Sequence, residues 1–183
     1  MSGDDRSVLT RSVFLVGFMG AGKTSVARKL ARMCALSSID MDTYLERREG
    51  RKVKEIFASD GEAAFRAIET EVLKELAAKD PLLVSCGGGV IMREENRLVL
   101  REHGFVVHMK VSVDEAVSRI SDISTRPLLQ DLEAARVRCA ERLPIYESLA
   151  HVTIDTSGKS VYAIAREVQR VLEREGVLCR QPR

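Results

Sequence analysis

Residues 13–24 read VFLVGFMGAGKT, and this stretch predicts a buried strand followed by a phosphate-binding turn. The first four positions, residues 13–16, are all apolar, which is typical of a central parallel strand covered on both faces. Residues 17–24 then match the spacing G-x-x-x-x-G-K-[ST] between a strand and a helix. The glycines let successive backbone N–H groups turn inward around an anionic phosphate, and the helix adds the positive end of its dipole.

This loop predicts that the chain binds a nucleoside triphosphate. Lys23 can reach the β- and γ-phosphates, and the Thr24 hydroxyl is a natural Mg²⁺ ligand. A plain strand–helix turn is the alternative, but a chance match to the full spacing is rare, under ~1% in a chain of this length. GTPases, ATPases, motors and small-molecule kinases all use such a loop, so the phosphate acceptor has to be sought in other residues.

The length and charge of the chain favour one soluble, intracellular domain. Its 183 residues are 45% hydrophobic, and 29 basic against 27 acidic side chains leave a net charge of +2. No large field draws the chain to nucleic acid or to an anionic membrane, and no apolar run approaches the ~20 residues of a membrane span. Asp4 and Asp5 stand where a secretory signal would be basic, and four scattered cysteines without a CxxC pair indicate reduced thiols in a cytoplasm.

Two periodicities alternate along the chain, which predicts a mostly parallel sheet with helices on both faces. The strand candidates are residues 13–16, 82–85, 105–109 and 151–154, with residues 36–40 as a weaker candidate. The helix candidates are residues 23–34, 62–78, 112–120 and about 160–176. We expect frayed ends before about residue 12 and after residue 176.

Two carboxylates, Asp40 and Asp42, lie at the carboxyl end of strand candidate 36–40, the edge where open parallel sheets bind their ligands. Alternation along a strand would point both side chains the same way. One could then orient a Mg²⁺-bound water, and the other could accept a hydrogen bond from a substrate hydroxyl. The alternative, of equal weight, is that Asp42 is the N-cap of a following helix.

Arg66 lies between Glu62 and Glu69 on one face of helix candidate 62–78. One interpretation is a solvated face carrying a weak Glu–Arg pair. The other is an arginine fork for a substrate carboxylate, held in place by its acidic neighbours. From these residues alone the solvated face is favoured.

Ser85 and three consecutive glycines, residues 87–89, follow strand candidate 82–85. Consecutive glycines cost backbone entropy and usually mark a close approach of the backbone to another group, with a flexible loop as the alternative. Ser85 could hold a Mg²⁺-bound water at the end of its strand.

Residues 120–129 are polar and break at Pro127, which predicts a mobile flap between two helical patterns. An arginine on such a flap, here Arg126, could neutralise the charge that develops on a γ-phosphate during transfer. Taken singly, Arg119, Arg126 and Arg142 would each be interpreted as ordinary surface arginines.

The motifs taken together and in order resemble the shikimate kinase family. They are GFMGAGKT, IDMD, IFASDGEAAFRAIE, SCGGGV, RPLL and ERLPIYESLA, over roughly residues 13–172. P-loop kinases in general share the first motif, whereas the combination of GE-x-x-FR-x-x-E, GGG and RPLL is much more specific. Two departures are visible: the stretch between Arg126 and Arg142 is a few residues short for the family, and residues 156–159 match its adenine loop only loosely.

The resemblance implies an α/β fold of the nucleoside-monophosphate-kinase type. Its three layers, α/β/α, enclose a five-stranded parallel sheet, and a mobile lid covers the site. One domain over residues 1–183 is expected, with a core at about 12–176, a substrate-binding helical region at about 42–70 and the lid at about 120–134.

The resemblance also implies the roles of individual residues. ATP would contact the phosphate loop at Gly20, Ala21, Gly22, Lys23, Thr24 and Ser25, with Arg119 on the adenine. Thr24 would bind Mg²⁺ directly, with Asp40 and Ser85 in its outer shell. The shikimate site would consist of Asp42, Phe57, Arg66, Gly87, Gly88, Gly89 and Arg142, with Arg66 and Arg142 on the carboxylate and Phe57 as an apolar wall.

Lys23, Asp42 and Arg126 would be the catalytic residues, with Asp42 on the reacting hydroxyl and the lid residue Arg126 on both substrates. The implied reaction is ATP-dependent phosphorylation of the 3-hydroxyl of shikimate, a step in chorismate and aromatic amino acid synthesis. We expect a cytoplasmic monomer that binds neither nucleic acid nor membrane. Two rivals are another small P-loop kinase, such as a gluconate kinase, and a catalytically silent nucleotide-binding module.

Overall fold

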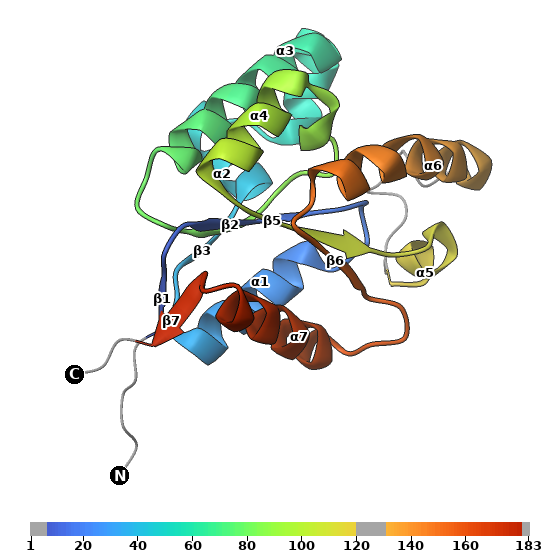
Figure 1. Ribbon diagram of the computed structural model, residues 1–183. Helices are drawn as coiled ribbons and strands as arrows, with labels where there is room; N and C mark the ends of the chain where they lie inside the picture. Colours follow the sequence, from blue (N-terminus) through green and yellow to red (C-terminus); the bar gives the residue numbers. More distant parts are fainter. Residues whose placement is uncertain (1–6, 120–130, 181–183) are drawn as a thin grey trace.

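A five-stranded parallel sheet forms the centre of the protein in a computed structural model that describes residues 7–119 and 131–180 (Figure 1). Its strands are β2 (Ser12–Val16), β3 (Ser38–Asp40), β4 (Leu83–Ser85), β5 (Gly104–Lys110) and β6 (Val152–Asp155). The spatial order is β3-β4-β2-β5-β6, and every pair is parallel, which confirms the expected sheet. The chain thus extends to one side of β2 first and to the other side later, and such sheets bind ligands at the carboxyl ends of the strands beside that switch point.

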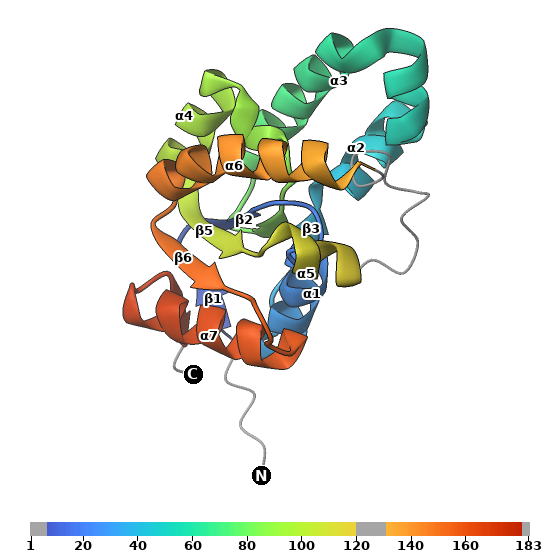
Figure 2. The ribbon, with the colours of Figure 1, turned by 90° about the vertical axis from the view of Figure 1, so that its right-hand side faces the viewer.

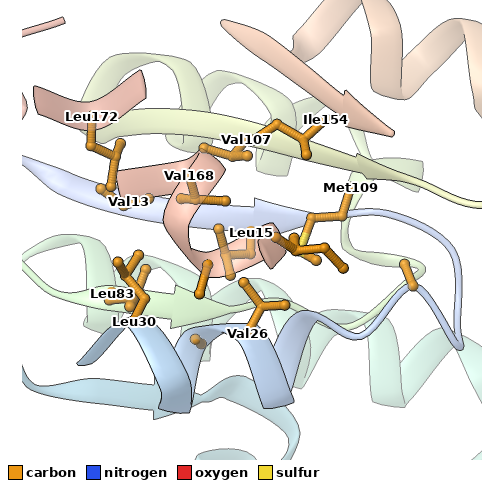
Figure 3. Close-up of a cluster of buried hydrophobic side chains, with 14 of the residues drawn as sticks. Val13, Leu15, Val26, Leu30, Leu83, Val107, Met109, Ile154, Val168 and Leu172 are labelled. Carbon is orange, nitrogen blue, oxygen red and sulfur yellow. The ribbon is translucent and has the colours of Figure 1, made fainter. Parts of the chain in front are cut away.

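The central strand β2 supplies one row of side chains to each face of the sheet, because successive residues of a strand point in opposite directions. Val13 and Leu15 pack against α1 (Lys23–Cys34) and α7 (Val161–Arg174), which cover the lower face in Figure 1. Figure 3 shows this cluster, which includes Val26, Leu30, Leu83, Val107, Met109, Ile154, Val168 and Leu172.

The opposite face of the sheet packs through Phe14 and Val16 against a second group of helices. These are α2 (Met41–Glu49), α3 (Val53–Ala77), α4 (Glu94–His103) and α6 (Leu132–Leu149). Figure 2 shows α6 lying across the side of the molecule above β5 and β6, with α5 (Val113–Ser118) below it. Among the described residues, no helix is both long enough and apolar enough to pass through a lipid bilayer.

Helix α3 begins at Val53, earlier than the helix expected from residue 62. Gly61, with φ 83° and ψ 173°, interrupts its helical backbone, so α3 consists of two helical segments. The first segment escaped prediction because only Ile56 in it is buried, which leaves no readable apolar stripe. The helix α4 and the short 3₁₀ turn η1 (Val90–Met92) before it were also not expected, and only Asn96 and Leu100 of α4 are buried.

The two ends of the described chain pair with each other. β1 (Ser7–Leu9) runs antiparallel to β7 (Leu178–Arg180), where frayed ends were expected. Val177 and Leu178 are buried and join the apolar cluster beneath α7. No short stretch of sequence could predict this pairing, because the two strands lie more than a hundred residues apart.

Candidate active site

The phosphate loop, residues 17–22, forms a tight turn between β2 and α1. Gly22 has a φ of 87° directly before the first residue of α1, a conformation that favours glycine. A side chain at Gly17 would collide with the Met109 carbonyl of β5, so the loop passes very close to the neighbouring strand. The Lys23 ammonium donates to the carbonyls of Gly17 at 2.8 Å and Phe18 at 3.0 Å. The ammonium and the N-terminus of α1 therefore lie together at one end of the loop, as binding of phosphates requires.

Three oxygen-bearing side chains meet at the start of α1. The Thr24 hydroxyl donates to Asp40 Oδ2 at 2.6 Å and lies 3.1 Å from Ser85 Oγ. Burial opposes ionisation of Asp40, but hydrogen bonds from Thr24 and Thr43 outweigh it and lower the pKa of this carboxyl. One ionised carboxylate and two hydroxyls suit Mg²⁺, which is usually held by one or two carboxylates, several waters and substrate phosphates. The residues present thus fit that ion.

The alternation argument for Asp40 and Asp42 is wrong, because β3 ends at Asp40 and α2 begins at Met41. Asp40 itself is the N-cap of α2, accepting from the Thr43 backbone N–H at 3.0 Å, so the cap interpretation applies to Asp40 and not to Asp42. Asp42 lies in the first turn of α2, where its carboxylate faces Gly87. Asp40 and Asp42 nevertheless line the same cavity, because a helical turn replaces the strand at this point.

Arg66 is held between two carboxylates. Its Nη1 lies 2.7 Å from Glu69 Oε2, and its Nη2 lies 3.2 Å from Glu62 Oε1. Only 15% of the Arg66 side chain and 2% of the Glu69 side chain are exposed, so the solvated-face interpretation is wrong for both residues. Burial raises the pKa of the Glu69 carboxyl even though Arg66 opposes that shift. This helix face packs on the glycine loop of residues 87–89. Helical periodicity cannot reveal that neighbour.

The glycine loop, residues 87–89, is in close contact on several sides, and the flexible-loop interpretation is wrong. A Cβ at Gly87 would lie 3.0 Å from Asp42 Oδ1 and 3.1 Å from Glu69 Oε1. A Cβ at Gly89 would overlap the guanidinium of Arg66. The loop can approach both the acidic groups and the arginine only because these positions carry no side chains.

Gly88 joins the glycine loop to the phosphate loop and to α6. Its ideal Cβ position is 3.6 Å from the Met19 backbone nitrogen, and its carbonyl accepts a hydrogen bond of 2.5 Å from the Tyr146 hydroxyl. Arg142 Nη1 lies 3.5 Å from the same carbonyl. Sequence reasoning found Arg142 but missed Tyr146, whose only signal was an aromatic side chain within the ERLPIYESLA motif.

Arg119 ties α5 to the turn that follows β6. Its guanidinium donates to the Thr156 hydroxyl at 3.0 Å and to Glu115 Oε1 at 2.6 Å. Glu115 also accepts from the Gly158 backbone N–H at 2.8 Å, and this bond is the main reason why the pKa of Glu115 is lowered. Arg119 and Lys159 thereby form one wall of a cavity that continues to the phosphate loop.

This cavity, of about 530 Å³, contains most of the predicted ATP-side residues and part of the acceptor side. Its lining includes Gly20, Ala21, Gly22, Lys23, Thr24, Ser25, Asp40, Asp42, Ser85, Gly87, Gly88 and Arg119. Phe57, Arg66, Gly89 and Arg142 do not line it. Phe57 is 37% exposed, and its ring lies 4.4 Å from that of Phe65. Arg126 and most of the expected lid lie outside the described residues.

A parallel sheet whose central strand leads through a glycine-rich loop into a helix, with a hydroxyl–carboxylate cluster at the same edge, defines a P-loop nucleotide-binding protein, the class that includes the small-molecule kinases. A sequence model of the family described as shikimate kinase matches residues 19–173. The chain belongs to the shikimate kinase family.

Individual relatives agree with this family. The shikimate kinase of Geobacter metallireducens is 40% identical over 166 residues, covering 89% of this chain and 92% of that protein. The solved structure of shikimate kinase from Acinetobacter baumannii in complex with shikimate is 34% identical, with a TM-score of 0.85 over 90% of this chain and 94% of that one. A gluconokinase from Sinorhizobium meliloti 1021 shares the fold alone, at 18% identity and a TM-score of 0.54 over 91% of this chain and 94% of that one.

Proposed function

We propose that this chain transfers the γ-phosphoryl group of ATP to the 3-hydroxyl of shikimate, as a step in the synthesis of aromatic amino acids. The observation that carries the proposal is Arg66, fixed by Glu62 and Glu69 against the glycine loop beside Asp42. A cyclic polyol acid requires a rigid guanidinium for its carboxylate and a carboxylate for its hydroxyl. Arg66 lies against Gly89 and Asp42 against Gly87, and Asp42 lines the cavity that contains the phosphate loop. The family and its A. baumannii member with bound shikimate support the same substrate.

On the ATP side, the backbone of residues 20–25 would cradle the phosphates. Lys23, which donates to two loop carbonyls here, would turn its ammonium to the β- and γ-phosphates. Thr24 would bind Mg²⁺ directly, and Asp40 and Ser85 would hold two of its waters. The ion would supply charge neutralisation between the phosphates. Arg119 would pack on the adenine from the wall that it forms with residue 159.

On the acceptor side, Arg66 and Arg142 would bind the shikimate carboxylate, and Phe57 would lie under the ring. The backbone of residues 87–89 would contact the substrate closely. Asp42 would hold the 3-hydroxyl through its carboxylate and receive its proton. Arg126, which lies outside the described residues, would contact both substrates.

In the reaction, the 3-hydroxyl oxygen forms a bond to the γ-phosphorus while the bond from that phosphorus to the β–γ bridging oxygen breaks. The electron pair of the broken bond stays on ADP, and the hydroxyl proton passes to Asp42. Most of the rate enhancement would come from positioning and from electrostatic stabilisation by Lys23 and the other cations.

A coupled assay of ADP release tests the proposal against its rivals. Release that depends on shikimate supports it, release with gluconate indicates a different small-molecule kinase, and no release with either acceptor indicates a silent nucleotide-binding module. The Asp42→Asn variant should lose about 10²-fold or more in kcat, the range for a removed general base. Asp80→Asn, a change at an exposed carboxylate, is the matched control and should leave kcat unchanged. Normal turnover in Asp42→Asn would refute the role of this carboxylate.

A further inference from the structure

Tyr146 is a buried phenol on α6 whose hydroxyl contacts the glycine loop and also interacts with the Arg142 side chain. Its side chain is 1% exposed, and the hydroxyl donates to the Gly88 carbonyl at 2.5 Å. Arg142 precedes Tyr146 by one helical turn and so projects from the same face of α6. Its Nη1 lies 3.5 Å from the same carbonyl oxygen. Two donors on one helix therefore converge on one acceptor, and the tyrosine makes the shorter bond.

The ring of Tyr146 is fixed from the sheet side. It stacks on His108 of β5, with ring centroids 5.0 Å apart and an interplanar angle of 13°. His108 Nδ1 lies 3.3 Å from the Thr153 hydroxyl of β6. Burial lowers the pKa of His108 to about 4 and raises that of the Tyr146 phenol. At neutral pH the imidazole is therefore uncharged, and the phenol retains the proton that it donates.

Gly88 in turn lies against the phosphate loop. Its ideal Cβ position is 3.5 Å from the Gly17 carbonyl oxygen and 3.6 Å from the Met19 nitrogen. The hydrogen bond from Tyr146 thus connects α6 to Gly88, where the glycine loop lies against the phosphate loop. The Tyr146 hydroxyl is the short hydrogen-bond donor to this partly buried carbonyl, and losing that partner costs free energy.

We propose that Tyr146 is a positioning residue for Arg142: by donating to the Gly88 carbonyl, its hydroxyl leaves the Arg142 guanidinium to bind the shikimate carboxylate. The inference rests on the proposed function, which assigns that carboxylate to Arg66 and Arg142. Arg142 already makes a long hydrogen bond of 3.5 Å to this carbonyl, so without the tyrosine hydroxyl it becomes the remaining donor and shifts closer to the carbonyl at the expense of the substrate. The glycine loop also loses one of its fixed contacts.

The test is Tyr146→Phe, which keeps the ring and its stacking on His108 and removes only the hydroxyl. We expect the KM for shikimate to rise about 5- to 20-fold, the effect of weakening one hydrogen bond to a charged group. The KM for ATP and kcat should each stay within about threefold. Tyr44→Phe is the matched control: it also loses a hydrogen-bonded phenol hydroxyl, which contacts Lys79 at 2.8 Å, and it should leave the KM for shikimate unchanged.

A double-mutant cycle with Arg142→Gln separates the possible outcomes. If Tyr146 acts through Arg142, adding Tyr146→Phe to Arg142→Gln raises the KM for shikimate less than twofold further. If the two substitutions instead raise the KM for shikimate independently, so that the double variant shows the product of the two single increases, the inference is overturned. An unchanged KM in Tyr146→Phe beside a raised KM in Arg142→Gln would overturn it too, while the proposed function stands. An unchanged KM in Arg142→Gln would instead remove the carboxylate assignment itself. Equilibrium titration of shikimate on the folded fraction gives the same comparison where a variant folds in low yield.

Discussion

Gly89→Ala should damage shikimate binding by displacing the Arg66 guanidinium. The backbone at Gly89 has φ −97° and ψ 0°, which alanine adopts without strain. The new Cβ, however, would lie 2.6 Å from Arg66 Cζ and closer still to the terminal nitrogens. Carbon atoms in contact are separated by ~3.5–4 Å, so the guanidinium must withdraw by roughly 1 Å. The displaced group is the end of a long side chain, so we expect the fold to survive.

The size of the effect follows from what Arg66 does in the proposed site. Hydrogen bonds to a charged group contribute about 1.5–3 kcal/mol each. Moving the Arg66 guanidinium by roughly 1 Å should cost one hydrogen bond to the shikimate carboxylate. That loss corresponds to a rise of about 10- to 150-fold in the KM for shikimate. The pull of Glu62 and Glu69 keeps the guanidinium from relaxing into a new position that suits the substrate. The KM for ATP should change less than about twofold.

The assay is coupled ADP release at varied shikimate and fixed saturating ATP. The Arg66→Ala background supplies the control, since an alanine at position 89 then has no guanidinium to displace. Gly89→Ala should add less than about twofold to the KM for shikimate in that background. A wild-type KM for Gly89→Ala, together with a raised KM for Arg66→Ala, would refute the steric argument.

Two further predictions concern pH and the nucleotide. Burial lowers the pKa of His108 from its ordinary 6.5 to about 4, so the unfolded chain takes up this proton first as the pH falls. The contribution of the uncharged His108 to the free energy of unfolding is fully present above about pH 6.5. It declines by up to ~3 kcal/mol as the pH falls towards 4. Urea unfolding at pH 7, 5.5 and 4.5 should show a shallower decline in His108→Gln, and equal declines would contradict the assignment. Arg119→Gln should raise the KM for ATP about 5- to 10-fold, because the Thr156 turn loses its anchor. In the same assay the KM for shikimate should stay within twofold, and an unchanged KM for ATP would remove Arg119 from the nucleotide site.

The sequence alone was sufficient for the individual strands and the phosphate loop, because the signal for each lies in residues close along the chain. An unbroken apolar run indicates a strand covered on both faces, and the spacing from Gly17 to Thr24 describes a single turn. The buried residues of α1 and α7 also follow their own helical periodicity. Asp42 and Arg66 were acceptor-side candidates from their own positions, each beside an alternative, and the order of motifs shared with a family then favoured these roles and added Arg142.

The tertiary structure decided what each acceptor-side residue touches. Helical spacing placed Arg66 on a face away from the core, but only the packed glycine loop shows that Glu69 is buried and Arg66 largely covered there. That Asp40, and not Asp42, is the N-cap of α2 depends on β3 ending directly before Met41. Tyr146 and its acceptor Gly88 stand 58 residues apart in the sequence. Contacts of this range arise when separate elements meet across the sheet, and no local pattern of residues records which elements will meet.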